Sequence, residues 1–129
     1  MRFGKKVISI PGAPKLPFSP AIRAGDYIFV SGQVGFIDAK GKEVKGIEAQ
    51  TRLCLENMKR VLVAADASLD DVVKVTVFLR NEEDFAKMNE IYQGYFSEDK
   101  PARSTVVAGL ALPNMLIEID CIAYCQPCI

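Results

Sequence analysis

The chain has 129 residues, with 16 Lys and Arg residues against 16 Asp and Glu residues, and it contains no histidine. The length predicts a single domain over residues 1–129, and the 50% content of hydrophobic residues is that of a folded globular protein. Without histidine there is no Ser-His-Asp triad, no Cys-His pair and no histidine-ligated metal site. The zero formal net charge argues against a broad nucleic-acid-binding surface.

No stretch of the sequence reaches the roughly 20 apolar residues of a membrane-spanning helix, so we expect no membrane partner. The run after the basic N-terminus, Val7-Ile8-Ser9-Ile10, is too short for the apolar region of a signal peptide. We therefore expect a cytoplasmic location, where the four cysteines are thiols rather than disulfides.

The N-terminal quarter of the chain predicts strands. Residues 6–10 are β-prone, and residues 11–20 hold four prolines, which predicts an extended loop. Residues 22–24 and 27–33 predict a hairpin around a Gly25-Asp26 turn.

The next segments predict a helix and a strand. Small or apolar residues recur at helical spacing between positions 47 and 65, and residues 68–71 predict a capped turn. Residues 73–79 alternate as in a strand with one buried face. The helical stripe consists of Thr51, Cys54, Leu55, Met58, Val61, Leu62 and Ala65, and the buried strand face of Val73, Val75, Val77 and Leu79.

The C-terminal third predicts a second helix and two strands. Asn81 is followed by three acids, which is typical of a helix N-cap and first turn. Pro101 ends that helix, and residues 102–107 and 116–124 predict the last strands, joined by a loop. The stripe of the second helix is Phe85, Met88, Tyr92 and Tyr95.

These elements predict an α+β fold of two layers, with a mixed six-stranded sheet carrying two helices on one face. Phe29 and Phe78 fall at positions that can face away from the helices. A sheet with two apolar faces and helices on only one usually packs against another subunit, so we expect an oligomer.

The most informative polar residues are Arg103 and Glu118. Arg103 opens an otherwise apolar strand, and Glu118 lies between two isoleucines. Burying either side chain is costly without a partner of opposite charge. One interpretation is a structural ion pair between neighbouring strands, or simple exposure to solvent; the other is a binding site for an anion.

The segment Pro101-Ala102-Arg103-Ser104-Thr105-Val106, continued through Gly109-Leu110-Ala111 to Ile117-Glu118-Ile119, resembles the signature of the Rid family, also called the YjgF family of reactive intermediate deaminases. The resemblance covers nearly the whole chain. Further matching segments are Arg23-Ala24-Gly25-Asp26, Val30-Ser31-Gly32-Gln33, Glu56-Asn57-Met58, the run from Asp70 to Phe78, and Phe85-Ala86-Lys87-Met88-Asn89.

The resemblance implies a chorismate-mutase-like fold and a homotrimer with clefts between its subunits. It implies hydrolysis of enamine or imine intermediates such as 2-aminoacrylate to a 2-keto acid and ammonia, with no metal and no cofactor. In this assignment the guanidinium of Arg103 binds the substrate carboxylate in a bidentate manner, and Glu118 orients and deprotonates the attacking water.

The resemblance also implies substrate-binding roles for Thr105, Ser31, Phe18 and Gly32. Backbone groups near Thr105 would hold the nitrogen end of the substrate, Ser31 would line the cleft, and Gly32 would allow a close approach of the chain. Two positions depart from the usual family pattern, because Phe18 replaces a tyrosine and Thr105 replaces a cysteine. The plain alternative for Phe18 is that its ring packs a loop.

Two other functions remain open. A non-catalytic trimer that binds small carboxylates would keep Arg103 without turnover. RNA cleavage is a third hypothesis, because relatives are labelled L-PSP endoribonucleases, but the zero net charge and the lack of histidine weigh against it.

The cysteines are a separate question. Cys121, Cys125 and Cys128 have a C-x3-C-x2-C spacing that some iron–sulfur sites use, but they span a strand and the chain end, so we expect no metal site. Cys54 falls on the helical stripe and is expected in the core.

Overall fold

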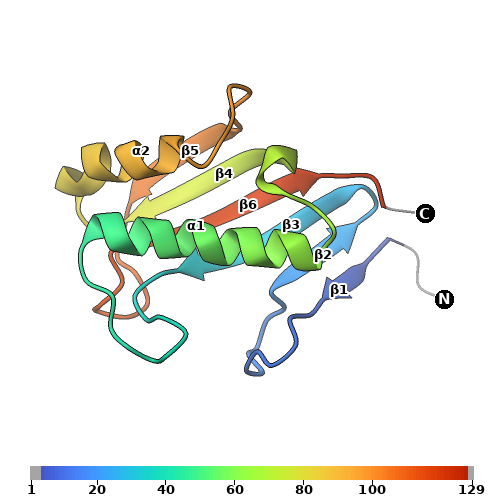
Figure 1. Cartoon of the computed structure of the whole chain (residues 1–129), viewed down its shortest axis with the longest axis horizontal. Helices are drawn as coiled ribbons and strands as arrows, with labels where there is room; N and C mark the ends of the chain where they lie inside the picture. Colours follow the sequence, from blue (N-terminus) through green and yellow to red (C-terminus); the bar gives the residue numbers. More distant parts are fainter. Residues whose placement is uncertain (1–3, 128–129) are drawn as a thin grey trace.

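The computed structural model describes residues 4–127, which form six strands and two α-helices (Figure 1). The order along the chain is the predicted one. The strands are β1 (Lys6–Ile8), β2 (Ala21–Ala24), β3 (Tyr27–Val34), β4 (Val72–Leu79), β5 (Ala102–Val107) and β6 (Ile117–Tyr124), and the helices are α1 (Ile47–Ala64) and α2 (Phe85–Gln93).

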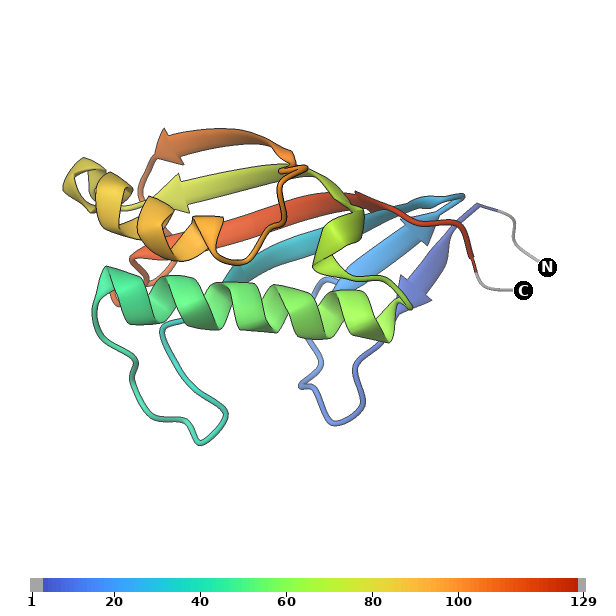
Figure 2. The ribbon, with the colours of Figure 1, turned by 45° about the horizontal axis from the view of Figure 1, so that its top comes forward.

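The strands form one sheet in the order β1-β2-β3-β6-β4-β5. β4 and β5 are parallel, with α2 in the connection between them, and the other neighbouring pairs are antiparallel. In Figure 2 both helices lie on one side of the sheet. The predicted two-layer α+β fold is therefore confirmed.

The core lies between the sheet and the helices. All seven residues of the predicted α1 stripe are buried, because a helix that covers a sheet turns one face toward it. The strand side is supplied mainly by residues of β4 and β6 that alternate along each strand and are fully buried: Val75, Val77, Leu79, Ile117 and Ile119.

Three local predictions were wrong. Val73 is 44% exposed and Val72 is buried instead, because the register of β4 against β6 shifts between Val72 and Lys74. Such a bulge adds one residue and reverses the alternation before it. Asn81 precedes a short 3₁₀ turn (Glu82–Asp84) and makes no side-chain cap, and Tyr95 lies beyond the end of α2.

The capped turn was predicted correctly. The backbone N–H of Ser68 donates to the Asp71 carboxylate (2.8 Å) at the 3₁₀ turn Leu69–Asp71, which leads into β4. This capping box fixes where β4 begins, directly before the bulge between Val72 and Lys74.

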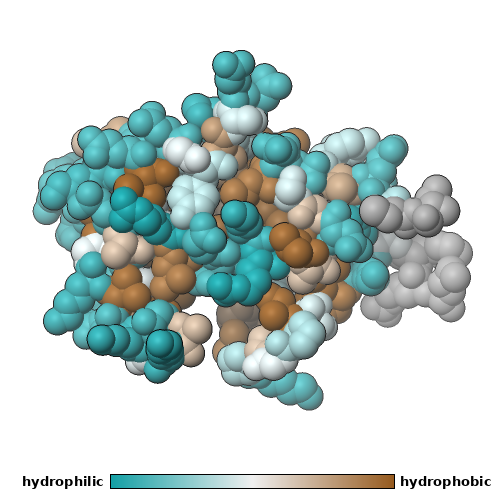
Figure 3. Space-filling model, in the orientation of Figure 1, coloured by the Kyte–Doolittle hydropathy of each residue, from teal (hydrophilic) through white to brown (hydrophobic). Residues whose placement is uncertain are grey.

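The two sides of the molecule differ in polarity. On the helix side, hydrophilic residues cover much of α1 and α2 (Figure 3). On the opposite side, which we call the outer face, large apolar side chains remain uncovered among residues 4–127: Tyr27, Phe29, Val106 and Tyr124 are each 42–46% exposed. No helix in the described part of the chain is long and apolar enough to span a bilayer.

Candidate active site

A hollow of about 410 Å³ opens beside Glu118 at one end of β3 and β6. We call it the Glu118 hollow. Its wall brings together four residues singled out from the sequence, Phe18, Ser31, Gly32 and Glu118, and adds Val34, Ala111 and Met115.

The Glu118 side chain projects from the outer face. Its neighbours Ile117 and Ile119 are fully buried toward the helices, and successive side chains of a strand point to opposite faces. Glu118 is paired with Val34 of β3 on one side and with Phe78 of β4 on the other. The carboxylate therefore lies on a central strand of the sheet, near the end at which β3 finishes and β6 begins.

Gly32 lets the carboxylate lie directly against β3. A Cβ atom at position 32 would be 2.8 Å from the carboxyl carbon of Glu118 and in closer contact with its Oε2 atom. The β3 register against β6 also shifts between Val30 and Gln33, so Gly32 lies in an irregular stretch of strand. Irregular stretches of this kind reorient side chains beside functional sites.

Ser31 ties the proline-rich loop to β3. Its hydroxyl donates to the carbonyl oxygen of Ser19 (2.6 Å), and its backbone N–H donates to that of Pro20 (3.0 Å). These two bonds hold Phe18 at the rim of the Glu118 hollow, where its ring is 55% exposed. Because the Ser31 hydrogen is already donated, its oxygen can serve a ligand only as an acceptor.

Two residues that were not predicted from the sequence, Gln50 and Arg80, hold the opposite wall of the hollow. The amide of Gln50, which is 2% exposed, donates to the carbonyl oxygens of Val44 and Asn114 and accepts from the N–H of Leu116. Arg80 donates to the carbonyl oxygen of Met115 (2.7 Å). A polar Gln on an otherwise apolar helix stripe was the available signal.

The environment of Glu118 makes it a stronger base than a surface carboxylate. Burial raises the pKa of its carboxyl group above the ordinary value, and the negative charge of Asp120 raises that pKa further. Asp120 shares the outer face, where Thr76 and Lys74 partly offset the effect of burial on its own pKa. A carboxyl group with a raised pKa holds a proton more strongly and so suits proton abstraction.

Arg103 lies on the other face of the sheet. It pairs with the buried Val75 of β4, and its guanidinium carbon lies 4.7 Å from the ring centre of Tyr92 and 5.8 Å from that of Phe85. Both rings belong to α2, so cation–π contacts hold the guanidinium under this helix. Within one chain the side chains of Arg103 and Glu118 project from opposite faces of the sheet. They therefore cannot form a structural ion pair with each other.

Thr105 follows Arg103 on the same face of β5. Its hydroxyl oxygen is buried and has no hydrogen-bond partner among residues 4–127, and the same holds for the hydroxyl of Tyr92. β5 pairs only with β4 and forms one end of the sheet. Arg103 and Thr105 are therefore grouped on an edge strand, away from the Glu118 hollow.

The sequence profile described as Endoribonuclease L-PSP matches residues 10–125. A RutC family protein of Pyrococcus horikoshii is 50% identical over 123 residues, which cover 93% of this chain and 98% of the relative. A protein of Dermatophagoides farinae named 2-iminobutanoate/2-iminopropanoate deaminase is 37% identical over 125 residues, which cover 95% and 98%. The crystal structure of the E. coli YjgF gene product is 34% identical, with a TM-score of 0.84, and the match covers 92% of this chain and 98% of that one.

The chain belongs to the Rid family. The resemblance noted from the signature around Arg103 and Glu118 is thereby confirmed for the family and for the fold.

The described thiols of this Rid family member are not placed for nucleophilic chemistry. Cys54 is fully buried in α1, where burial and the Glu118 charge raise its pKa far above the ordinary value. Burial and then Asp120 raise the pKa of Cys121 to about 12. Cys121 faces the core and Cys125 lies at the chain end, while Cys128 lies outside the described residues.

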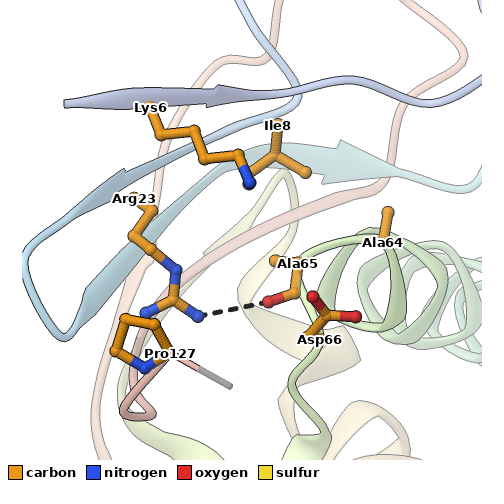
Figure 4. A pocket seen from close by; sticks show the side chains of 7 residues that line it. All are labelled: Lys6, Ile8, Arg23, Ala64, Ala65, Asp66 and Pro127. Carbon is orange, nitrogen blue, oxygen red and sulfur yellow. Dashed lines mark hydrogen bonds between the residues drawn. The ribbon is translucent and has the colours of Figure 1, made fainter. Parts of the chain in front are cut away.

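A second hollow, of about 280 Å³, lies at the C-terminal end of α1 and is structural in character (Figure 4). The Arg23 guanidinium donates to the carbonyl oxygens of Ala65 (3.2 Å) and Cys125 (2.6 Å). These bonds satisfy a helix-terminal carbonyl and fasten Cys125, the residue after β6, to the end of α1. Arg23 is thus committed to protein contacts.

Proposed function

We propose that this Rid family member is a hydrolytic deaminase that converts 2-imino acids and their enamine tautomers, such as 2-aminoacrylate, to 2-keto acids and ammonia. The observation that carries the proposal is the position of the Glu118 carboxylate, which lies against Gly32 in a hollow. Its surroundings raise the pKa of this carboxyl group. The name of the Dermatophagoides farinae relative supports this substrate class. We also propose a cytoplasmic location, to be tested by imaging a tagged chain.

The proposal requires a site made by two copies of the chain. Arg103 and Glu118 leave opposite faces of the sheet, so one small substrate cannot contact both within a single chain. The uncovered apolar outer face and the edge strand β5 support assembly through these surfaces. We propose a homotrimer in which Arg103 and Thr105 of one copy face the Glu118 hollow of the next.

In the proposed reaction the Arg103 guanidinium binds the substrate carboxylate through two parallel hydrogen bonds. Glu118 takes a proton from water, and the water oxygen forms a bond to the C=N carbon while the π electrons move to nitrogen. The protonated Glu118 returns this proton to the nitrogen, which gives a carbinolamine; the hydroxyl proton then also passes to the nitrogen, the C–N bond breaks, and ammonia leaves as the C=O bond forms. One imine and one water thus give one keto acid and one ammonia.

Phe18 and Thr105 fit this scheme without the side chains that many relatives carry. The Phe18 ring closes the rim of the hollow but offers no hydroxyl to the water, so Glu118 alone must orient it. Thr105 contributes through its backbone on β5. If the protein bound small carboxylates but did not turn over imines, the alternative hypothesis of a non-catalytic, carboxylate-binding trimer would be favoured.

The test is a coupled assay in which an amino acid oxidase generates the imine and keto acid formation is followed. Glu118→Gln keeps the side-chain shape and removes the base, so turnover should fall roughly 10²- to 10⁴-fold while pyruvate binding persists. The exposed Glu98→Gln is the matched control and should behave as wild type. Full turnover by Glu118→Gln would refute the assignment, and RNA cleavage that survives Arg103→Ala would favour the endoribonuclease hypothesis.

A further inference from the structure

The loop of residues 108–116 joins β5 to β6 and forms part of the wall of the Glu118 hollow. Ala111 and Met115 line the hollow from this loop. The loop contains no helix or strand, and Met115 is its only buried residue. Apolar packing therefore does little to hold this wall in place, and hydrogen bonds are the main restraint that remains.

Arg80 donates most of the side-chain hydrogen bonds that reach this loop. Its Nε–H group donates to the carbonyl oxygen of Met115 (2.7 Å), and its Nη2 atom donates to those of Leu112 (2.7 Å) and Leu110 (3.4 Å). The guanidinium is planar and rigid, so the two short bonds fix both the distance and the direction of the loop. Because Leu110 and Leu112 flank Ala111, Arg80 holds both residues with which the loop lines the hollow.

Arg80 projects from the same face of the sheet as Glu118. Leu79, the last residue of β4, is fully buried toward the helices, so the alternation places Arg80 on the outer face. The backbone N–H of Arg80 donates to the carbonyl oxygen of Leu116 (3.0 Å), which continues the β4–β6 ladder by one residue. Glu118 pairs with Phe78, two residues before Arg80. The guanidinium and the carboxylate therefore start from neighbouring positions of one face.

Gln50 holds the end of the loop that leads into β6. Its amide nitrogen donates to the carbonyl oxygen of Asn114 (3.0 Å), and its amide oxygen accepts from the N–H of Leu116 (2.9 Å). These bonds do not involve Arg80, and β6 is paired with a strand on each side. Removal of the Arg80 side chain should therefore loosen the wall and leave the Glu118 carboxylate in place.

We infer that Arg80 is a positioning residue for substrate binding, which holds Ala111 and Met115 as a preformed wall of the Glu118 hollow. The inference rests on the proposed function, because it takes this hollow as the substrate site. A wall that is already ordered spares the substrate the free energy of ordering it. Since the wall would contact the substrate alike in the ground state and the transition state, its loss should raise KM and leave kcat nearly unchanged.

The experiment measures the Kd of pyruvate by calorimetry, and kcat and KM with the imine that an amino acid oxidase generates from alanine. Arg80→Ala should weaken pyruvate binding and raise KM about tenfold, with kcat within about threefold of wild type. Arg80→Lys offers one donor nitrogen in place of a planar fork, so it should restore only part of the binding. The pH–rate profile should not move, because burial and Asp120 are what raise the Glu118 pKa.

Arg23→Ala is the matched control. The Arg23 guanidinium also donates to three carbonyl oxygens, those of Gly25, Ala65 and Cys125, but it does so at the C-terminal end of α1 (Figure 4). None of these residues lines the Glu118 hollow. Arg23→Ala should therefore lower the melting temperature while KM and the pyruvate Kd keep their wild-type values.

Hydrogen exchange followed by mass spectrometry reports on the wall without relying on activity. In Arg80→Ala the amides of residues 108–116 should exchange faster, while those of β6 keep their protection. Faster exchange throughout β6 as well would mean a general loss of stability and would overturn the inference. Wild-type KM and pyruvate Kd in Arg80→Ala would also overturn it.

Two further outcomes are decided by the same measurements. If Arg80→Ala does not fold, wild-type KM and pyruvate Kd in Arg80→Lys would overturn the inference, and a partial loss would support it. If wild type binds pyruvate without turning over the imine, the proposed function is refuted, and the Kd values still decide the role of Arg80 in binding. If wild type neither binds pyruvate nor turns over the imine, both are refuted.

Discussion

Gly32→Ala offers the sharpest test of the candidate site, because the structure predicts a loss of activity without a loss of stability. The added Cβ would lie 2.8 Å from the Glu118 carboxyl carbon and 3.1 Å from its Cγ. The atoms that must move are the end of a flexible side chain on a partly solvent-exposed face, and the backbone at Gly32 is not left-handed. Unfolded-state entropy even favours alanine by about 0.4–1 kcal/mol.

The expected effect on catalysis is large. Relieving the contact moves the carboxylate by about 1 Å, and a displacement of that size from the reactive geometry typically costs about 100-fold in rate. We therefore expect kcat to fall about 100-fold in the coupled imine assay, with a melting temperature within a few degrees of wild type.

Gly35→Ala is the matched control with the opposite outcome. Its Cβ would press on backbone atoms of α1, the carbonyl oxygen of Gln50 and the amide nitrogen of Cys54, which cannot rotate away. Overpacking of this kind costs about 1–3 kcal/mol, or roughly 3–10 °C in melting temperature for a domain of this size. Both variants are to be compared at equal protein concentration, because assembly shifts the midpoint.

Two results would refute the reasoning. Full turnover by Gly32→Ala would show that the position of the Glu118 carboxylate against β3 is not needed. A destabilised Gly32→Ala, with a melting temperature as low as that of Gly35→Ala, would show that the close contact is structural packing rather than placement of a base.

Two further predictions concern the surroundings of the site. Asp120→Asn removes a charge that raises the Glu118 pKa, so the part of the pH–rate profile where activity rises with pH should move to lower pH. Burial should keep part of the increase in pKa. An unchanged pH–rate profile would contradict this prediction. Tyr92→Leu removes the ring 4.7 Å from the Arg103 guanidinium and should raise KM about fivefold, equivalent to roughly 1 kcal/mol of cation–π energy, whereas Tyr92→Phe keeps the ring and should keep KM in steady-state kinetics.

The fold was predictable because its strongest signals are periodic. The α1 stripe from Thr51 to Ala65 contains only buried residues, and the proline-rich loop and the Gly25-Asp26 turn lie where the sequence indicates. These features depend on spacing within one segment. A helix facing a sheet, or a strand with one buried face, imposes that spacing directly.

The bulge in β4 was not predictable in the same way. Val72 and Val73 are chemically equivalent, and only the pairing with β6 decides which of them is buried. Register between strands depends on contacts that are distant in sequence. One added residue then reverses the direction of every preceding side chain.

The relative placement of the two main site residues also lay beyond the sequence. Glu118 could be assigned to the outer face because Ile117 and Ile119 flank it, but Ala102 and Ser104 beside Arg103 are too small to indicate a face. The contacts of Arg103 with Tyr92 and Phe85 decide it, and they join β5 to α2. Gln50 was missed for a similar reason, since its partners lie at positions 44, 114 and 116.

Because Arg103 and Glu118 project from opposite faces of the sheet, we expect complementation between two kinds of inactive chain. If each site takes Arg103 from one copy and Glu118 from another, Arg103→Ala and Glu118→Gln chains should each be inactive alone but active when unfolded together and reassembled. In randomly mixed trimers at equal amounts, half of the chains supply Arg103 and half supply Glu118, so about one quarter of the clefts are intact and about a quarter of wild-type activity should return. Trimers mixed without dissociation are the control and should stay inactive. If mixed assemblies, verified by mass spectrometry, recover nothing, then both residues act within one chain or one of them does not act at all, and the two-copy site is wrong.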